Sequence, residues 1–321
     1  MKAAKYTRYG PPEVVSVVET DKLQPGPNEV LIKIHATTVN RTDCGFRSAE
    51  YFVSRFWSGL FRPHTTVLGN EFAGEIAAVG EEVTLFHIGD RVFGYDDSRF
   101  GGHAEYKVVA ENSTLSLIPD CVAYHEAAPI TEGAHYALAN IRAAKVKAGQ
   151  QVLVNGATGA IGSAAVQLLR YFGAYVTAVC ATPHVDLVKH LGADVVVDYL
   201  ATDFTRTNQK FDFIFDAVGK SSFRQCKPLL EKNGIYVSTE LGKNGENVPL
   251  AILTPIFGGR KVIFPIPGFN TEDIQLLGKL VTEGHFKPVI DRRYSLNQIV
   301  DAYRYVETGQ KIGNVVIDVV T

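Results

Sequence analysis

The sequence predicts a two-domain α/β protein, in which a β-rich domain is followed by a doubly wound parallel sheet. The chain has 321 residues, more than one hydrophobic core usually holds. Short strand-like runs separated by Gly and Pro fill residues 1–120, as in a compact β domain. Strand-like and helical runs alternate over residues 121–267, which is typical of an open parallel sheet. The tail, residues 268–321, has a helical pattern and ends in an apolar strand, and we expect it to return to the first domain.

The expected strands are short apolar runs rich in β-branched residues. In the first domain we expect strands at 30–35, 72–79 and 104–109. In the second domain we expect them at 151–156, 174–180, 193–199, 211–219, 234–240 and 261–266, with helices between several of them. The tail should form a helix at 271–283 and a strand at 314–320.

The most informative stretch is residues 151–170, QVLVNGATGAIGSAAVQLLR, whose pattern indicates a strand, a tight turn and a helix. Ala157, Gly159 and Gly162 occupy the three positions of the dinucleotide-binding fingerprint, with Ala in the first position. Small side chains let the backbone approach a pyrophosphate, and the helix begins with unpaired N–H groups and the positive end of its dipole. The alternative is a plain connecting turn. The expected cofactor contacts of this turn are Gly156, Ala157, Thr158, Gly159, Ala160, Ile161 and Gly162.

The residues after the next expected strand favour NADP(H) over NAD(H). An NAD site usually has an Asp or Glu about 20 residues beyond the glycines, where it binds the ribose hydroxyls. Here residues 180–184 read CATPH, so no carboxylate stands there to repel a 2′-phosphate. Asp186 falls in the first turn of the following helix, where an acid usually has a structural role. The candidate phosphate contacts are Thr182, His184, Lys189 and Tyr199, with a solvated helix residue as the simpler reading of Lys189 and a strand end as that of Tyr199.

Composition disfavours several functional classes. The net charge of −2 and the pI near 6.5 indicate no polyanion-binding surface, so we expect no nucleic-acid partner. No apolar segment approaches the roughly 18 residues that a membrane span needs, and the N-terminus lacks a signal-type apolar core, so we expect a cytoplasmic protein. The cysteines lie far apart, which indicates neither a disulfide framework nor a zinc knot: Cys44, Cys121, Cys180 and Cys226.

Several segments together resemble the medium-chain dehydrogenase/reductase family, and in particular its zinc-independent quinone oxidoreductase branch. They cover nearly the whole chain: PGPNEVLIKIHATTVNRTD, LGNEFAGEIAAVG, GDRVFG, GGHAEYKVV, NGATGAIGSAAVQLLR, LGADVVVDY, FDFIFDAVG and the terminal GNVVIDV. The resemblance implies a GroES-like first domain, a Rossmann second domain and a nicotinamide bound in the cleft between them. It also adds Val218 and Gly219, in FDFIFDAVG, to the expected cofactor contacts.

Two positions argue against a catalytic zinc ion. Zinc-dependent members of this family place a Cys and a His in the segments that match VNRTD and LGNEFAG, where thiolate and imidazole suit the metal. Here those positions are Asn40 and Asn70, and a neutral carboxamide is a poor zinc ligand. Cys44 lies four residues from the ligand position and is expected to be a small buried hydrophobe. Glu71 is expected to be a structural hydrogen-bond acceptor.

Without a Lewis acid, the resemblance implies reduction of electrophilic acceptors rather than oxidation of alcohols. We expect hydride transfer from C4 of NADPH to a small apolar electrophile, either a quinone or the β-carbon of an enone or alkenal. The candidate catalytic residues are Asn40, as an N–H donor to the acceptor oxygen, together with Asp43 and Arg47. The alternative for Asp43 and Arg47 is a structural ion pair. Tyr51, Tyr95 and solvent are the candidate proton donors.

Two apolar segments have open interpretations. Residues 51–61 repeat apolar side chains at helical spacing, which indicates either core packing or an aromatic wall for a flat substrate. Residues 249–259 fit a buried helix, a pocket edge or the contact surface of a homodimer.

Two other functions remain open beside quinone or alkene reduction. One is a trans-acting enoyl-thioester reductase, which would prefer acyl thioesters to quinones. The other is a non-catalytic NADPH-binding protein with a structural or RNA-associated role, because a cofactor site would look the same in its sequence.

Overall fold

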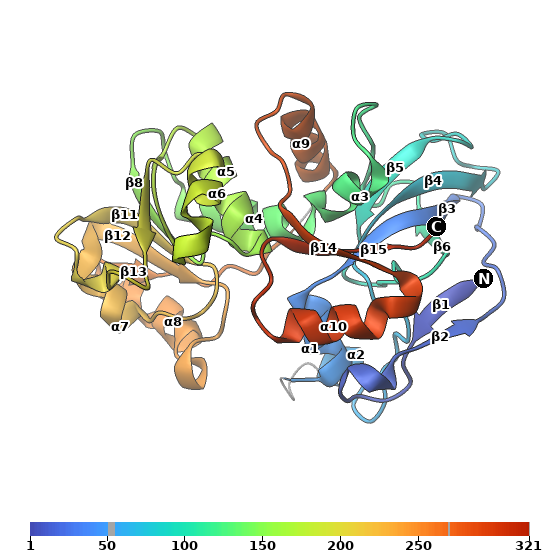
Figure 1. Cartoon of the computed structure of the whole chain (residues 1–321), viewed down its shortest axis with the longest axis horizontal. Coiled ribbons are helices and arrows are strands. Elements are labelled where there is room, and N and C mark those ends of the chain that lie inside the picture. Colours follow the sequence, from blue (N-terminus) through green and yellow to red (C-terminus); the bar gives the residue numbers. More distant parts are fainter. Residues whose placement is uncertain (51–54, 269, 321) are drawn as a thin grey trace. The chain divides into compact units, whose positions relative to one another are not determined.

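A computed structural model describes residues 1–50, 55–268 and 270–320, and the chain divides into two compact units. The first unit comprises Met1–Glu132, Asn270–Thr282 and Pro288–Thr321, and the second comprises Gly133–Phe269 and Glu283–Lys287. One unit is β-rich and the other is a parallel α/β sheet, which confirms the predicted fold class (Figure 1).

The first unit reaches residue 132 rather than the expected boundary at residue 120. The helix α3 (Tyr124–Ala127) and the 3-10 turn Ala128–Ile130 account for the difference, because both contact β3 (Glu29–Val39) and β4 (Glu71–Val79). Residues 121–132 therefore pack with the β-rich unit, although their helical pattern resembles the second domain.

A mixed sheet in the order β14-β15-β3-β4-β5-β7 forms the first unit, and β6 also pairs with β3 (Figure 1). The C-terminal strand β15 runs antiparallel to β3, with Val315 opposite Val39, so the tail returns to this unit. The remaining elements of this unit are β1 (Lys2–Lys5), β2 (Ser16–Glu19), β5 (Arg91–Tyr95), β6 (Tyr106–Ala110), β7 (Leu115–Leu117), β14 (Ile290–Ser295), β15 (Asn314–Asp318), α1 (Arg41–Ser48), α2 (Arg55–Ser58), α9 (Thr271–Thr282) and α10 (Ile299–Glu307).

The core of the first unit lies on one face of β3. Ile32 and Ile34 point to that face, since alternate residues of a strand share a side, and both are fully buried. Helix α10 covers them with the equally buried Ile299, Tyr303 and Val306. Burying each large apolar side chain contributes about 1.5–3 kcal/mol to folding.

The second unit is a parallel sheet in the order β10-β9-β8-β11-β12-β13. If β8 is counted as the first strand, this order is 3-2-1-4-5-6, which is that of a Rossmann fold. The strand order reverses between β8 and β11, whereas the strands themselves stay parallel. Ligands of such sheets bind at the carboxyl ends of the strands beside this switch point. The elements are β8 (Gln151–Asn155), β9 (Tyr175–Cys180), β10 (Val195–Asp198), β11 (Phe211–Asp216), β12 (Leu230–Ser238), β13 (Lys261–Val262), α4 (Glu132–Ala144), α5 (Ala160–Tyr171), α6 (Val185–His190), α7 (Phe223–Cys226) and α8 (Asn247–Phe257).

The two segments with open interpretations are largely exposed. In the first, Phe56 is 69% exposed and Phe61 is 86% exposed, so core packing is wrong for these two rings. Tyr51, one of the candidate proton donors, lies outside the described residues. In the second, Ile256 and Phe257 of α8 are 72% and 83% exposed, so α8 is not a buried helix.

Within the described part of the chain, no helix is long and apolar enough to cross a membrane. The cysteines are free thiols, with Cys121 exposed and Cys44, Cys180 and Cys226 buried. Cys44 is thus the buried side chain that we expected, and burial raises the pKa of its thiol to about 12.

Candidate active site

The turn after β8 has the geometry of a phosphate-binding turn. Gly156 has φ = +81°, and a Cβ atom there would lie 2.3 Å from Cγ1 of Val218, so only glycine fits. Ala157 is fully buried, and its N–H donates to the Val179 carbonyl at 3.0 Å. This bond ties the turn to the neighbouring strand β9.

The start of helix α5 is open above the turn. Gly159 is the N-cap residue and offers no side chain to the helix, so the first N–H groups have no intrahelical partner. A Cβ atom on Gly159 would meet no neighbouring atom closer than the Gly156 carbonyl oxygen, at 3.9 Å. A Cβ atom on Gly162 would instead lie 2.0 Å from that same oxygen. Gly162 therefore lets the helix pack against the turn, while Gly159 leaves room for a ligand.

This turn fits a dinucleotide. Its partly exposed residues surround unpaired N–H groups at the positive end of the helix dipole, which is the chemistry that binds a pyrophosphate. The residues that would hold the pyrophosphate are the partly exposed Thr158, Gly159, Ala160 and Ile161.

A buried carboxylate, Asp216, holds the tips of β8 and β11 together. It accepts hydrogen bonds from Asn155 Nδ2 at 3.0 Å and from both the backbone N–H and the hydroxyl of Ser221 at 2.8 Å. The loop that it shapes contains Val218, which is 37% exposed, and Gly219, at φ = +63°. These two expected cofactor contacts thus lie at the switch point. Sequence reasoning missed Asp216, although an acid at the end of the buried run FDFIFD was a signal for it.

The tips of β9 and β10 carry the other expected contacts. The Thr182 hydroxyl donates to the Asp198 carboxylate at 2.5 Å, and Tyr199, 55% exposed, follows Asp198 directly. The hydrogen bond from Thr182 is the largest cause that lowers the pKa of Asp198. His184 is partly exposed. Sequence reasoning found no carboxylate after β9, but the neighbouring strand brings one to the same tip.

Lys189 lies on the surface of α6. Its side chain is 60% exposed and lies 3.8 Å from the Asp186 carboxylate. This exposed i,i+3 pair matches the simpler reading of Lys189 as a solvated helix residue.

In the first unit, a chain of hydrogen bonds links Asn40, Asn70 and Glu132. Asn40 Nδ2 donates to Asn70 Oδ1 at 2.7 Å, and Asn70 Nδ2 donates to Glu132 Oε2 at 2.7 Å. At the other end, Asn40 Oδ1 accepts from the Asp43 backbone N–H at 3.0 Å. All of these side chains are at most 5% exposed.

The Asp43 end of this chain sets its direction. The Asp43 N–H can only donate, so it must face the oxygen of Asn40, which turns Asn40 Nδ2 towards Asn70 Oδ1 and Asn70 Nδ2 towards Glu132. Each carboxamide then uses one of its two Nδ2 hydrogens within the chain. Thr42 adds a hydroxyl donor to Glu132 Oε1 at 2.6 Å. Sequence reasoning missed Glu132, which lies 62 residues from its partner Asn70.

Glu71 is a buried acceptor, as expected. Its carboxylate accepts from the hydroxyls of Thr38 and Thr131 at 2.6 and 2.8 Å and from the Glu132 N–H at 2.7 Å. Burial raises the pKa of Glu71 to about 7 and, together with the charge of Glu71, that of Glu132 to about 8. The Tyr95 hydroxyl is a further hydrogen-bond partner of Glu132, so this candidate proton donor belongs to the same network.

Asp43 is the fully buried partner of Asn40 in a reciprocal cap at the start of α1. Its carboxylate accepts from the backbone N–H groups of Asn40 at 3.1 Å and of Gly69 at 2.9 Å. Burial raises the pKa of Asp43 to about 7. His103 Nε2 lies 3.9 Å from this carboxylate. Asp43 therefore orients Asn40.

Arg47 is fully buried at the other end of α1. Its guanidinium donates to the Gly10 carbonyl and to the Glu307 carboxylate, and it lies 5.1 Å from the centre of the Tyr303 ring. These contacts tie α1 to α10. They support the structural reading of Arg47, with Glu307 rather than Asp43 as its ion-pair partner.

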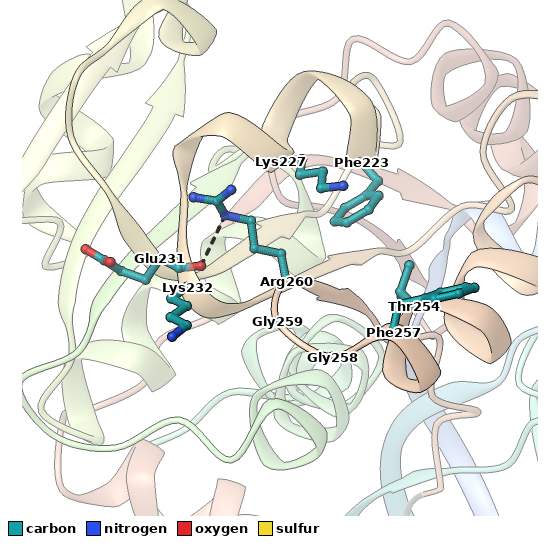
Figure 2. Close-up of a pocket in the computed structure, with 9 residues that line it drawn as sticks. All are labelled: Phe223, Lys227, Glu231, Lys232, Thr254, Phe257, Gly258, Gly259 and Arg260. Carbon is teal, nitrogen blue, oxygen red and sulfur yellow. Dashed lines mark hydrogen bonds between the residues drawn. The ribbon is translucent and has the colours of Figure 1, made fainter.

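A hollow of about 570 Å³ opens elsewhere on the second unit, at the amino ends of β12 and β13 (Figure 2). Figure 2 shows Arg260 directed at the Glu231 carbonyl, to which its Nε donates at 3.3 Å. Thr254 and Phe257 of α8 line this hollow, which agrees with the pocket-edge reading of residues 249–259. It lies at the opposite ends of the strands from the dinucleotide turn.

A Rossmann turn in one unit and a buried polar network in a separate β-rich unit are together typical of a nicotinamide-dependent oxidoreductase. Comparisons with known proteins agree. Residues 26–120 match the family described as alcohol dehydrogenase GroES-like domain, and residues 191–317 match the one described as zinc-binding dehydrogenase. The chain therefore belongs to the medium-chain dehydrogenase/reductase family, in its quinone oxidoreductase branch, as its motifs indicated.

Individual relatives support this placement. The 2-methylene-furan-3-one reductase of Solanum lycopersicum is 32% identical over 99% of this chain and 79% of its own length. The chloroplastic NADPH-dependent alkenal/one oxidoreductase of Arabidopsis thaliana is 28% identical over the same shares. The structure of the quinone oxidoreductase from Coxiella burnetii has a TM-score of 0.88 and 28% identity, and covers 100% of this chain and 99% of its own.

A catalytic zinc ion, which one family description names, does not fit the side chains present. The two matching positions hold Asn40 and Asn70, whose carboxamides are hydrogen-bonded to each other. Among the residues that the structure describes, no group of three or more His, Cys, Asp or Glu side chains is arranged to hold a metal ion. Thiolate, imidazole and carboxylate are the usual zinc ligands, and a neutral amide is not among them.

Proposed function

We propose that this protein uses NADPH to reduce quinones or activated alkenes, without a zinc ion. The single observation that carries the proposal is the Asn40–Asn70 hydrogen bond, which Glu132 and the Asp43 N–H anchor at its two ends. It replaces a metal-ligand set with two oriented amide donors. Such donors suit an acceptor that is already electrophilic, whereas alcohol oxidation needs a Lewis acid to stabilise the alkoxide.

When bound, the cofactor supplies a hydride from C4 of its nicotinamide. Reduction of such an acceptor would develop negative charge on its oxygen. The second Nδ2 hydrogen of Asn40 is not used in the bond to Asn70, and it would donate to that oxygen and stabilise its charge. Asp43 holds Asn40 in place through the helix cap, and Arg47 holds α1 against α10. The proton that completes the reduction comes from solvent or from Tyr95.

The preference for NADPH rests on the tip of β9. Residues 180–184 provide no carboxylate of their own, while His184 and Tyr199 offer hydrogen-bond donors for a 2′-phosphate. The Thr182 hydroxyl at the same tip donates to Asp198. The name of the Arabidopsis relative specifies NADPH. Dissociation constants for NADPH and NADH test this preference, and tighter binding of NADH would contradict it.

A panel of acceptors tests the activity. Purified protein is given NADPH and, in separate assays, a benzoquinone, an enone, an alkenal and an enoyl thioester, and NADPH oxidation is followed by absorbance. We expect turnover with the quinone, enone or alkenal. A preference for the thioester would favour the trans-acting enoyl reductase instead. Thermal stabilisation by NADPH with no turnover of any acceptor would show a non-catalytic binding protein.

Three further expectations stay predictions. The exposed apolar side chains of α8 support a homodimer, since a large apolar patch on a protein surface usually marks a contact. A cytoplasmic location and the absence of a nucleic-acid partner rest on composition, and the Arabidopsis relative is named as chloroplastic.

A further inference from the structure

Three strand tips of the second unit lie in register along one edge of the sheet. Asn155 of β8 lies opposite Val179 of β9, and Cys180 of β9 lies opposite Asp198 of β10. Neighbouring strands are about 4.8 Å apart, so the Asp198 backbone lies within about 5 Å of the tip of β9. The Thr182 hydroxyl then brings the two tips together through its 2.5 Å bond to the Asp198 carboxylate.

A Rossmann fold binds the adenosine ribose of its cofactor at this edge of the sheet. The pyrophosphate lies at the start of α5, and the group that meets the ribose 2′ position comes from the tip of the next strand, here β9. Thr182 follows that tip, and its hydroxyl proton is already donated to Asp198. A 2′-phosphate at this position would therefore meet an anionic carboxylate and a hydroxyl whose proton is engaged.

The charge of Asp198 is held firmly in place. Its Oδ1 accepts the Leu200 N–H at 2.9 Å and its Oδ2 accepts the Thr182 hydroxyl, and these bonds lower the pKa of the carboxyl group. The nearest helix offers a cation, Lys189, but that side chain lies beside Asp186. Asp198 is therefore an oriented negative charge beside Thr182 at the tips of β9 and β10.

We propose that Asp198 is a specificity-determining residue that limits the preference of this site for NADPH over NADH. The inference rests on the proposed binding of a nicotinamide dinucleotide by the second unit. Like charges repel, and a 2′-phosphate carries up to two negative charges where NADH has a neutral hydroxyl. This repulsion weakens the binding of NADPH but not that of NADH. A variant without the charge of Asp198 should therefore bind NADPH more tightly.

The test compares Asp198→Asn with the wild type in the full-length protein. Asn keeps an oxygen that accepts the Thr182 or Leu200 hydrogen bond but carries no charge. Kd values for NADPH and NADH, and for the fragments 2′,5′-ADP and 5′-AMP, are measured by calorimetry at low salt. We expect Asp198→Asn to bind NADPH and 2′,5′-ADP about tenfold more tightly, because two charges against one at about 6 Å in water repel by that amount. NADH and 5′-AMP should change less than about twofold.

Asp194→Asn is the matched control. Asp194 precedes the same strand at its opposite end, about 13 Å from Asp198 along β10, and loses the same charge. This control should leave the ratio of the two Kd values unchanged. Raising the salt to about 1 M should shrink the gain of Asp198→Asn, since the screening length falls to about 3 Å. Asp198→Ser provides a second neutral variant and should show the same gain.

The outcomes separate the two proposals. If the wild type binds neither cofactor, the proposed function fails and this inference fails with it. If both cofactors bind but Asp198→Asn and Asp198→Ser leave the NADPH/NADH ratio unchanged, only the assignment of Asp198 is overturned. An equal gain in NADPH affinity in Asp194→Asn would also overturn the assignment of Asp198, because the effect would then come from the net charge of the protein and not from this position.

Discussion

Gly159 and Gly162 lie three residues apart at the start of α5 and perform different tasks. The space above Gly159 is open, and its φ of −70° is accessible to any residue. Gly162 faces the Gly156 carbonyl so closely that a methyl group cannot fit without moving the helix. Gly162 is thus required for packing of the helix, whereas Gly159 leaves open space at its start.

We predict opposite effects for alanine at these two positions. Gly159→Ala should keep the thermal stability within about 1 kcal/mol of the wild type but weaken NADPH binding at least about tenfold, because the methyl group occupies the place of the pyrophosphate. Gly162→Ala should lose about 1–3 kcal/mol of stability through overpacking. Thermal unfolding and NADPH titration measure both effects. Equal loss of stability in the two variants would contradict the assignment.

In the proposed reaction, the chemistry depends on Asn40. Asn40→Ser keeps a side-chain oxygen for the helix cap but removes the amide donor, so we predict a fall of about 10²-fold in kcat/KM with an unchanged Kd for NADPH. Asn270→Ser is the matched control, since Asn270 and Asp273 form the same reciprocal cap before α9. Steady-state kinetics with a quinone test the pair. Comparable kcat/KM values in both variants would remove Asn40 from the reaction.

At the scale of the elements, the segment 131–132 at the start of α4 connects much of the first unit. Thr131 and the Glu132 backbone bind Glu71 of β4, which Thr38 of β3 also reaches, and the Glu132 side chain binds Thr42 of α1. The carboxyl groups in this region titrate at raised pKa values because they are buried. The packing of these elements should therefore depend on pH.

The direction of this dependence follows from the raised pKa values. The folded protein binds protons on Asp43 and Glu71 with pKa values of about 7 and on Glu132 with one of about 8, whereas the unfolded chain releases them near pH 4. Between those limits the folded state holds more protons than the unfolded chain. The stability that these three groups contribute is therefore greatest below about pH 4 to 5, and it decreases as the pH rises towards 8.

We predict that the melting temperature falls between pH 5 and pH 8.5 and that Glu132→Gln reduces this fall. Gln accepts the Asn70 hydrogen bond but cannot ionise, and relief of about 1 kcal/mol corresponds to about 2–4 °C for a unit of this size. Glu50→Gln, which changes an exposed carboxyl group of the same unit, is the control. Circular dichroism measures the melting temperatures of the three proteins. A melting temperature of the wild type that rises between pH 5 and pH 8.5 would contradict the prediction.

Elements with a strong apolar pattern could be predicted from the sequence, and those defined by tertiary contacts could not. The strands β3, β4, β8, β9 and β11 can be recognised in the sequence as apolar runs, because both of their faces are covered. The pattern of β14, IDRRYS, is polar because it is an edge strand, so its pairing with β15 was not apparent.

The candidate site also has one part that could be predicted from the sequence and another that depends on tertiary contacts. The glycine turn is local, and its residues follow one another in the chain. Glu132 and Asp198 depend on partners 62 and 16 residues away, and their roles required the pairing and register of strands. A search for an acid after β9 alone could not find a carboxylate that the neighbouring strand supplies.

At the scale of the whole molecule, the exposed face of α8 leads to a prediction about assembly. Ile252 and Ile256 lie one helical turn apart and are 66% and 72% exposed. We predict that light scattering finds twice the 35.1 kDa mass of the chain, and that Ile252→Glu with Ile256→Glu yields a monomer. Ile88→Glu, at a 68% exposed position of the first unit, should not change the mass. A monomeric wild type would contradict the prediction.

The absence of a role for zinc is the central claim, and the metal dependence of turnover tests it most directly. The protein is dialysed against a chelator, its zinc content is checked by mass spectrometry, and NADPH oxidation with a quinone is measured before and after addition of Zn²⁺. We predict full quinone reduction by the metal-free protein and no alcohol oxidation with or without added zinc. Loss of quinone reduction on chelation, restored by stoichiometric Zn²⁺, would contradict the assignment of Asn40 and Asn70.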